Sequence, residues 1–222
     1  MQRSANLTIL LVLIASPVLA GTLYDEPRGP SLQYQPALGS FTYLGIRFAL
    51  DQPSQITTLH TELALVGDGS SSFFAALVRL PTVTSLPRGN PFIAEEIVHS
   101  EIFDLAGDSL HPVSIPFPVT VGPGAYAVVL GAGLFGSTES VGFAGYYEPM
   151  PDSSALTWSS FRPDPPYTPW ADNAVGTFRM TVEGVAVPEP SPFAFCLGSL
   201  ALFGWLRHGG CGRCLCDTRA RL

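Results

Sequence analysis

Glycine and proline interrupt this chain at short intervals, and this restricts what it can fold into. The 222 residues include 22 glycines and 21 prolines, with short apolar segments between them. No amphipathic helical pattern of about 12 residues or more occurs in the middle of the chain. We therefore predict an all-β fold of about eight or nine strands, arranged as a two-sheet antiparallel jelly-roll-like sandwich.

Alternation of apolar and polar residues locates several strands. Residues 56–66 place leucines on one face and His60 with its polar neighbours on the other, which predicts a half-buried strand. The turn at 67–70 leads into the apolar run 73–80, and we expect these two strands to form a hairpin. A change of phase at Leu44-Gly45 predicts a β-bulge.

Later strands differ in how exposed they should be. Residues 113–121 alternate regularly, but Pro116 and Pro118 cannot donate ladder hydrogen bonds, so this strand is expected at a sheet edge. The continuous run 125–130 is expected to be a central strand. Residues 177–185 form the closing strand, with Phe178, Met180 and Val182 inward.

The N-terminus has the pattern of a secretory signal peptide. Arg3 supplies the early positive charge, residues 7–14 are an apolar or hydroxyl-bearing run, and Val18-Leu19-Ala20 offers small residues before Gly21. The apolar run is short for a membrane span, so we predict cleavage between Ala20 and Gly21.

The C-terminus has the pattern of a sorting signal. Pro188, Glu189 and Pro190 form a stiff block before the apolar segment 193–206. Four arginines follow this segment and orient it with the tail on the cytoplasmic side: Arg207, Arg213, Arg219 and Arg221. The predicted organisation is a signal peptide at 1–20, a sandwich ectodomain at 21–184, a linker at 185–192, a transmembrane sorting helix at 193–206 and a basic, cysteine-containing cytoplasmic tail at 207–222.

This tail resembles the PEP-CTERM tails of bacterial exported proteins. The resemblance implies processing at Pro188-Glu189-Pro190 by a membrane-embedded exosortase-type enzyme. Two features depart from the family. The apolar segment would be about 21 Å long as a helix, against a hydrocarbon core of about 30 Å. Its arginines are also spread out, since a Gly/Cys stretch separates Arg207 from Arg213. The alternative is that 193–206 is a buried C-terminal helix, although it has no polar face.

A second resemblance covers roughly residues 41–185. The strands near Ser40-Phe41 and 56–59, and the Pro123-Gly124-Ala125-Tyr126 turn into an apolar strand, look like the "choice-of-anchor" β-sandwich domains. That group implies an exported sandwich upstream of an interchangeable surface anchor. It brings no general catalytic activity.

Charge and cysteine content limit the partners of the ectodomain. The chain has no lysine, and residues 21–184 hold six arginines against 16 acidic residues, a formal net charge of −10. Such a domain repels nucleic acid and anionic surfaces. Neutral extracellular polysaccharide remains a compatible partner. All four cysteines lie outside residues 21–184, so the domain must depend on its apolar core.

We expect no metal and no cofactor, with two alternatives. Cys211, Cys214, Cys216 and His208 could supply four zinc donors, but they lie in the short tail. Oxygen ligands for calcium occur in loops without an Asp-x-Asp-x-Asp-Gly pattern, namely Asp104, Asp108, Asp152, Asp164, Asp172 and Asn173.

We also expect no enzymatic activity. His60, His99 and His111 are candidates for acid–base chemistry, but no Gly-x-Ser-x-Gly elbow accompanies them. Glu95 and Glu96 are adjacent and, on a strand, would face opposite sides.

Four aromatic residues near the end of the domain have two interpretations: Trp158, Phe161, Tyr167 and Trp170. They could form a platform for sugar rings, or they could cap an open end of the sandwich. The sequence thus predicts an exported surface or extracellular-matrix protein with a structural or adhesive ectodomain. The alternative is a carbohydrate-binding module that uses the 158–170 aromatics.

Overall fold

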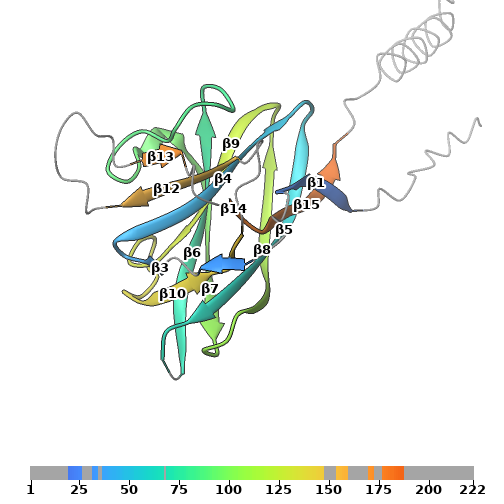
Figure 1. The fold of residues 1–222 in the computed structure, drawn as a ribbon. Coiled ribbons are helices and arrows are strands. Elements are labelled where there is room, and N and C mark those ends of the chain that lie inside the picture. Colours follow the sequence, from blue (N-terminus) through green and yellow to red (C-terminus); the bar gives the residue numbers. More distant parts are fainter. Residues whose placement is uncertain are drawn as a thin grey trace, which may run out of the picture. The chain divides into compact units, whose positions relative to one another are not determined.

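The computed structural model describes residues 20–26, 32–34, 37–67, 69–147, 154–159, 170–172 and 177–187. The chain divides into two units, 1–186 and 187–222, and the described strands all belong to the first. The described residues of this unit form an all-β structure with two large antiparallel sheets and one short 3-10 turn, η1 (Ala94–Glu96) (Figure 1).

Sheet A is organised around the long strand β5 (Ser54–Leu65). One edge of β5 pairs with β8 (His111–Val121). The other edge is shared, because β15 (Met180–Ala186) pairs with residues 54–61 and β10 (Val141–Ala144) pairs with residues 63–65. The sheet continues through β15 to β1 (Gly21–Asp25) and through β10 to β3 (Ala37–Gly39).

Sheet C has the strand order β13-β12-β4-β9-β6-β7. The strands are β13 (Trp170–Asp172), β12 (Ala155–Ser159), β4 (Thr42–Leu50), β9 (Gly124–Gly131), β6 (Ser70–Leu80) and β7 (Ile97–Ala106). A third, small sheet B contains β14 (Thr177–Phe178), β11 (Tyr146–Tyr147) and β2 (Leu32–Tyr34). It begins where β10 and β15 leave the edge of β5 near Thr61 and Glu62.

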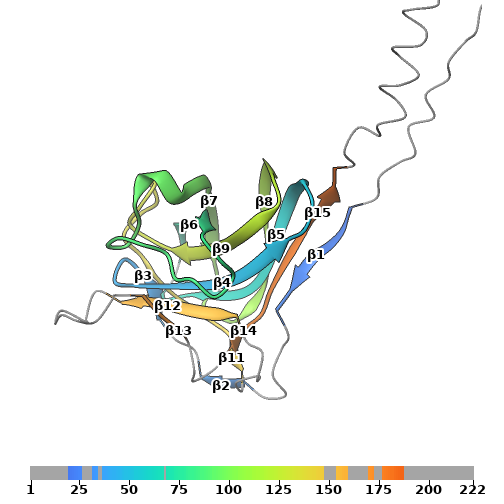
Figure 2. The same cartoon turned by 90° about the horizontal axis from the view of Figure 1, so that it is seen from above.

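Two apolar clusters hold the sheets. The larger one lies between sheets A and C, whose strands are seen from above in Figure 2. It includes Leu59, Phe73, Ile115, Val128 and Phe178, each fully or almost fully buried. The second cluster covers the outer face of sheet C, with core residues Tyr43, Phe74, Val78, Val129, Leu156, Trp158 and Trp170. The inner strands β4, β9 and β6 of sheet C are therefore buried on both faces, whereas sheet A is buried on one.

Several predicted strands are confirmed. β8 pairs only with β5 among the described residues, so it is an edge strand, and Pro116 and Pro118 face outward. β9 lies between β4 and β6 as a central strand. Phe178, Met180 and Val182 all point into the core.

The predicted hairpin of residues 56–66 and 73–80 is wrong. β5 belongs to sheet A and β6 to sheet C, so the connection at 66–69 crosses from one sheet to the other. The partners of β6 are β7 and β9. β6 is buried on both faces, because Phe73, Ala75 and Leu77 enter the larger core while Phe74 enters the second cluster. A strand of this kind belongs inside sheet C, whereas β5 has a polar outer face.

The predicted bulge at Leu44-Gly45 is also wrong. β4 pairs with β9 from Leu44 to Leu50 without a shift in register. The apparent change of phase arises because both faces of β4 are buried. Gly45 instead allows close packing, since a Cβ there would lie 2.8 Å from the Val128 carbonyl oxygen and 2.9 Å from Leu156 Cδ1.

Two smaller expectations need correction. We expected about eight or nine strands, whereas the described residues contain fifteen. The difference comes from short strands among β1–β3 and β10–β14, which the sequence patterns did not resolve as separate elements. Residues 155–159, expected across one end of the sandwich, instead extend sheet C as β12 beside β4.

Candidate functional site

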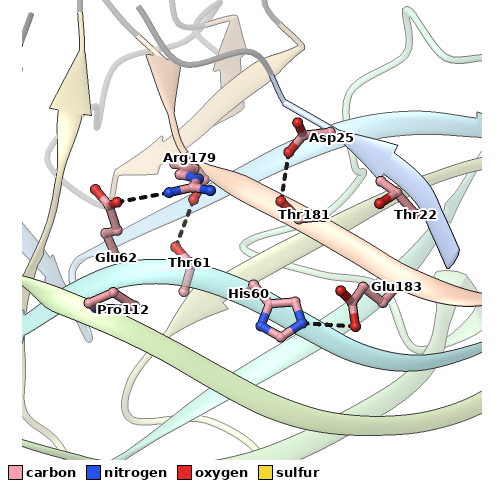
Figure 3. A pocket seen from close by; sticks show the side chains of 9 residues that line it. All are labelled: Thr22, Asp25, His60, Thr61, Glu62, Pro112, Arg179, Thr181 and Glu183. Atoms are coloured by element: carbon pink, nitrogen blue, oxygen red, sulfur yellow. Dashed lines mark hydrogen bonds and ion pairs between the residues drawn. The ribbon is translucent and has the colours of Figure 1, made fainter. Parts of the chain in front are cut away.

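A hollow of about 520 Å³ lies on the polar outer face of sheet A. Figure 3 shows its lining: Thr22, Asp25, His60, Thr61, Glu62, Pro112, Arg179, Thr181 and Glu183. These residues come from β1, β5, β8 and β15 and from Arg179 between β14 and β15. The alternation of β5 and β15 points their polar residues to this face.

A row of three polar side chains crosses this face of sheet A, and two of them, His60 and Glu183, line the hollow. His60 Nδ1 lies 2.9 Å from the Ser114 hydroxyl on β8, and His60 Nε2 lies 3.0 Å from Glu183 Oε2 on β15. The first contact has hydrogen-bond geometry, whereas Nε2 is in ion-pair range of Glu183 without an aligned hydrogen bond.

A serine, a histidine and a carboxylate in a row invite comparison with a hydrolytic triad. A triad needs the acid to orient the imidazole through an aligned hydrogen bond, and Glu183 does not provide one. The side chains of His60 and Glu183 are also 37% and 41% exposed. The row is better explained as cross-strand pairing on a wet sheet surface.

A second polar group lies beside this row. Arg179 Nη1 contacts Glu62 Oε1 at 3.3 Å, and the Tyr147 hydroxyl donates a hydrogen bond to Glu62 Oε2. The Thr181 hydroxyl donates to Asp25 Oδ1 at 2.6 Å. Three carboxylates and one guanidinium therefore line the hollow, and each carboxylate already contacts a side chain of the domain.

A buried polar network connects β1 with sheet C, and sequence reasoning missed it. Glu26 is 1% exposed, and its carboxylate accepts hydrogen bonds from the Tyr24 hydroxyl, from the Ser154 hydroxyl at 2.5 Å and from the Ser154 N–H at 3.1 Å. Burial, followed by the hydrogen bond to Glu26, raises the pKa of the Tyr24 hydroxyl above its ordinary range.

Arg47 extends the same network. It is 8% exposed, lies 2.7 Å from Asp172 Oδ1 through Nη2, and donates from Nη1 to the Thr84 carbonyl at 3.2 Å. Its Nε also reaches the Ser154 carbonyl at 3.4 Å. Short-range sequence patterns carry no signal for contacts such as Glu26–Ser154 and Arg47–Ser154, whose residues lie more than 100 positions apart.

The structure places the two described aromatic candidates inside the second cluster. Trp158 is 4% and Trp170 is 1% exposed. Trp158 stacks on Tyr43 at 4.6 Å between ring centroids, and the Trp170 indole N–H donates to the Pro91 carbonyl at 2.6 Å. Neither indole presents an open face to a sugar ring. Phe161 and Tyr167 lie outside the described residues.

The predicted processing sites are described only in part. Ala20 is exposed, and Gly21 is the first residue of β1. Pro188, Glu189, Pro190, the segment 193–206, the four tail arginines and the tail cysteines lie outside the described residues. In the part of the chain that is described, no helix has the length and apolarity needed to cross a membrane.

The other candidate residues do not gather into one site. Glu95 and Glu96 lie in η1, so the expectation that they face opposite sides of a strand is wrong. Glu96 is buried and paired with Arg88. His99 pairs with Glu101, and His111 contacts the Ser109 carbonyl. Among the described residues, no group of three His, Cys, Asp or Glu side chains could hold a metal ion. Asp152, Asp164 and Asn173 lie outside that part.

Comparisons with known proteins add little to this site. No protein-family model and no curated protein matches the chain. Eight chains of solved structures do match. One, from the infectious bursal disease virus Gx strain, is 13% identical, with 87% of this chain and 48% of that chain covered and a TM-score of 0.26. Another, the VP2 D431N mutant of the same virus, is 13% identical, with 86% and 48% covered and a TM-score of 0.24. The chain thus spans about half the length of these structures, and likenesses this weak carry no argument about fold or function.

Proposed function

We propose that this chain is the precursor of an exported surface or extracellular-matrix protein, processed at Pro188-Glu189-Pro190 by an exosortase-type enzyme. The ectodomain would then have a structural or adhesive role. One observation carries the proposal. The sandwich occupies the interval between the two predicted processing signals: β1 starts at Gly21, directly after Ala20, and β15 ends at Ala186, two residues before Pro188.

The pairing of β1 with β15 supports this proposal further. Gly21 lies opposite Gly184, so the first and last residues of the sandwich lie at the same end of sheet A. Ala20 and Val187 are both exposed. A domain with both ends accessible at one place can be cleaved at each without disturbing its core.

The architecture also suits an extracellular domain that lacks disulfides. The core between the sheets consists of apolar side chains, and residues 21–184 hold no cysteine. We further propose that the fold is jelly-roll-like. The strand orders β1-β15-β5-β8 and β4-β9-β6-β7 support this, since all but one of the connections from β4 to β9 cross between the sheets.

Intact mass of the protein recovered from the surface or medium of its native host tests the proposal. We expect a species that begins at Gly21 and ends near Pro190. Replacing Pro188, Glu189 and Pro190 with alanine should leave a larger, membrane-held precursor. A triple alanine variant at the exposed loop residues 82–84 is the control, and it should be processed normally. An unchanged mature mass and location in the Pro-Glu-Pro variant would overturn the sorting proposal.

A further inference from the structure

β7 is the longest edge strand without proline in the described structure. It has 10 residues, forms the end of sheet C, and pairs with β6 alone among the described residues. An edge strand presents unpaired backbone N–H and C=O groups that can pair with another strand. Val98, the extra residue of a bulge against β6, is 39% exposed, and Ile102 is 47% exposed.

The other edges of the described sheets are shorter or blocked. β8 has 11 residues but contains Pro112, Pro116 and Pro118. β1 has five residues, while β3 and β13 have three each. Proline on an edge and short edge strands both prevent pairing between molecules. β7 has neither form of protection.

The residues of β7 are complementary to themselves when two copies run antiparallel. With Ser100 opposite Ser100 of the second copy, Val98 lies opposite Ile102 and His99 lies opposite Glu101. We propose that β7 is the surface through which two copies of this chain associate, in this register, so that two copies of sheet C form one continuous sheet. The contact is isologous, as in most closed dimers.

Neighbouring registers are less favourable. In an antiparallel strand pair, directly opposed side chains lie on the same face of the sheet. The two sandwiches therefore lie on the same side of the joined sheet only when the two-fold axis passes between two copies of the same residue. An axis at Glu101 would oppose two carboxylates, and an axis at Ile102 would place Glu101 opposite Phe103. Like charges directly opposite each other destabilise a strand pair. The axis at Ser100 places each His99 imidazole opposite a Glu101 carboxylate, and each Val98 opposite an Ile102.

The His99–Glu101 pair is partly exposed and can reach this contact. His99 Nε2 lies 2.9 Å from Glu101 Oε1 in the same chain, and the two side chains are 26% and 36% exposed. In the proposed dimer the two pairs form an alternating group of two imidazoles and two carboxylates. Inward charges on an edge strand can also keep a protein monomeric. The experiment must therefore distinguish attraction from protection.

Thiol cross-linking of the purified full chain tests the contact. Ser100→Cys places one thiol on the proposed axis, and Thr120→Cys places one on the exposed outer face of the blocked strand β8. After mild oxidation, peptide mapping identifies which positions are joined, so the tail cysteines do not confuse the result. We expect the link between the two thiols at position 100 to form roughly tenfold more than the link between the two thiols at position 120, because association raises the local thiol concentration.

Two further variants test the register and the charges. A mixture of Val98→Cys and Ile102→Cys chains should give the mixed link between positions 98 and 102. Adding Glu101→Arg to Ser100→Cys should abolish the link, and adding His99→Glu as well should restore it. Circular dichroism confirms that each variant is folded. Equal linking at positions 100 and 120, or linking that is unaffected by Glu101→Arg, would overturn the proposal whether or not the sorting tail is processed.

Discussion

The outer faces of the two large sheets differ in polarity: that of sheet A is polar and partly exposed, and that of sheet C is apolar and mostly buried. On sheet A, residues such as His60, Glu62 and Glu183 form ion pairs and hydrogen bonds at a partly exposed surface. On sheet C, Tyr43, Phe74 and Val129 occupy the corresponding outward positions and are buried. Sheet A separates the core from solvent, while the inner strands of sheet C lie between two apolar layers.

Long connections explain this difference. The segment between β6 and β7 supplies Leu86 and Phe92, and the segment after β9 supplies Leu134 and Phe135. These side chains cover sheet C and allow its strands to be apolar on both faces. The aromatic residues Tyr43, Phe74, Trp158 and Trp170 therefore stabilise a second core, whereas the outer face of sheet A carries partly exposed ion pairs.

The largest effect is expected from the second core. Trp170→Ala should lower the free energy of unfolding by about 3–5 kcal/mol, because it removes a buried indole and leaves a cavity. Urea denaturation measures the change. Thr58→Ala on the outer face of sheet A is the control and should change stability by less than about 0.5 kcal/mol.

A glycan array with the same Trp170→Ala protein sharpens this result. If the variant stays as stable as the parent but loses binding to a glycan, Trp170 belongs to a sugar site and the capping interpretation fails.

A smaller effect is expected from the buried network. Arg47→Met should cost about 2 kcal/mol, since it removes the buried guanidinium together with its ion pair to Asp172 and its hydrogen bond to the Thr84 carbonyl. Arg179→Met on the outer face of sheet A is the matched control, because Arg179 is 47% exposed. Equal losses for both variants in chemical denaturation would contradict the distinction between the two regions.

Alkaline pH should act on the buried tyrosines. Burial raises the pKa of both Tyr24 and Tyr43. A raised pKa in the folded state means that stability is fully present below the unfolded pKa of about 10 and is lost as pH rises above it. Denaturation curves between pH 8 and about 11 should therefore show falling stability above about pH 10. Tyr24→Phe should reduce this slope, and an unchanged slope would argue against Tyr24 as its source.

The smallest effect is expected from the polar row on sheet A. Ser114→Ala and His60→Gln should each change the free energy of unfolding by less than about 0.5 kcal/mol, because their contact is exposed. Thermal unfolding measures this. The same variants should leave any hydrolysis of a simple ester unchanged, and a loss of such activity in both would support a catalytic role for the row.

Sequence reasoning placed the strands with clear alternation. β5, β8 and β15 border solvent on one side, so period-two patterning marked their inner and outer residues correctly. It also located β9, because a continuous apolar run fits a strand with neighbours on both sides. The bulge predicted in β4 and the hairpin partner predicted for β6 were wrong, because apolar residues on both faces of these strands leave no alternation that identifies the inner face.

The candidate site was less predictable. His60 could be recognised as an outward polar residue, but its partners Ser114 and Glu183 lie 54 and 123 positions away in the printed sequence. Glu26 and Ser154 form a buried contact that no local pattern indicates. Such contacts depend on which strands become neighbours, and that depends on non-local packing.

The sequence by itself determined the all-β class, the edge character of β8, the outward face of β5 and the position of the domain between two predicted processing signals. These features follow from local rules, since alternation, proline and turn residues act within a few positions of the chain. Only the tertiary structure decided that β5 and β6 belong to different sheets, that Trp158 and Trp170 are buried, and that β7 is left as an open edge. Pairing of strands is selected by the total apolar surface buried in the folded domain, which no single segment contains.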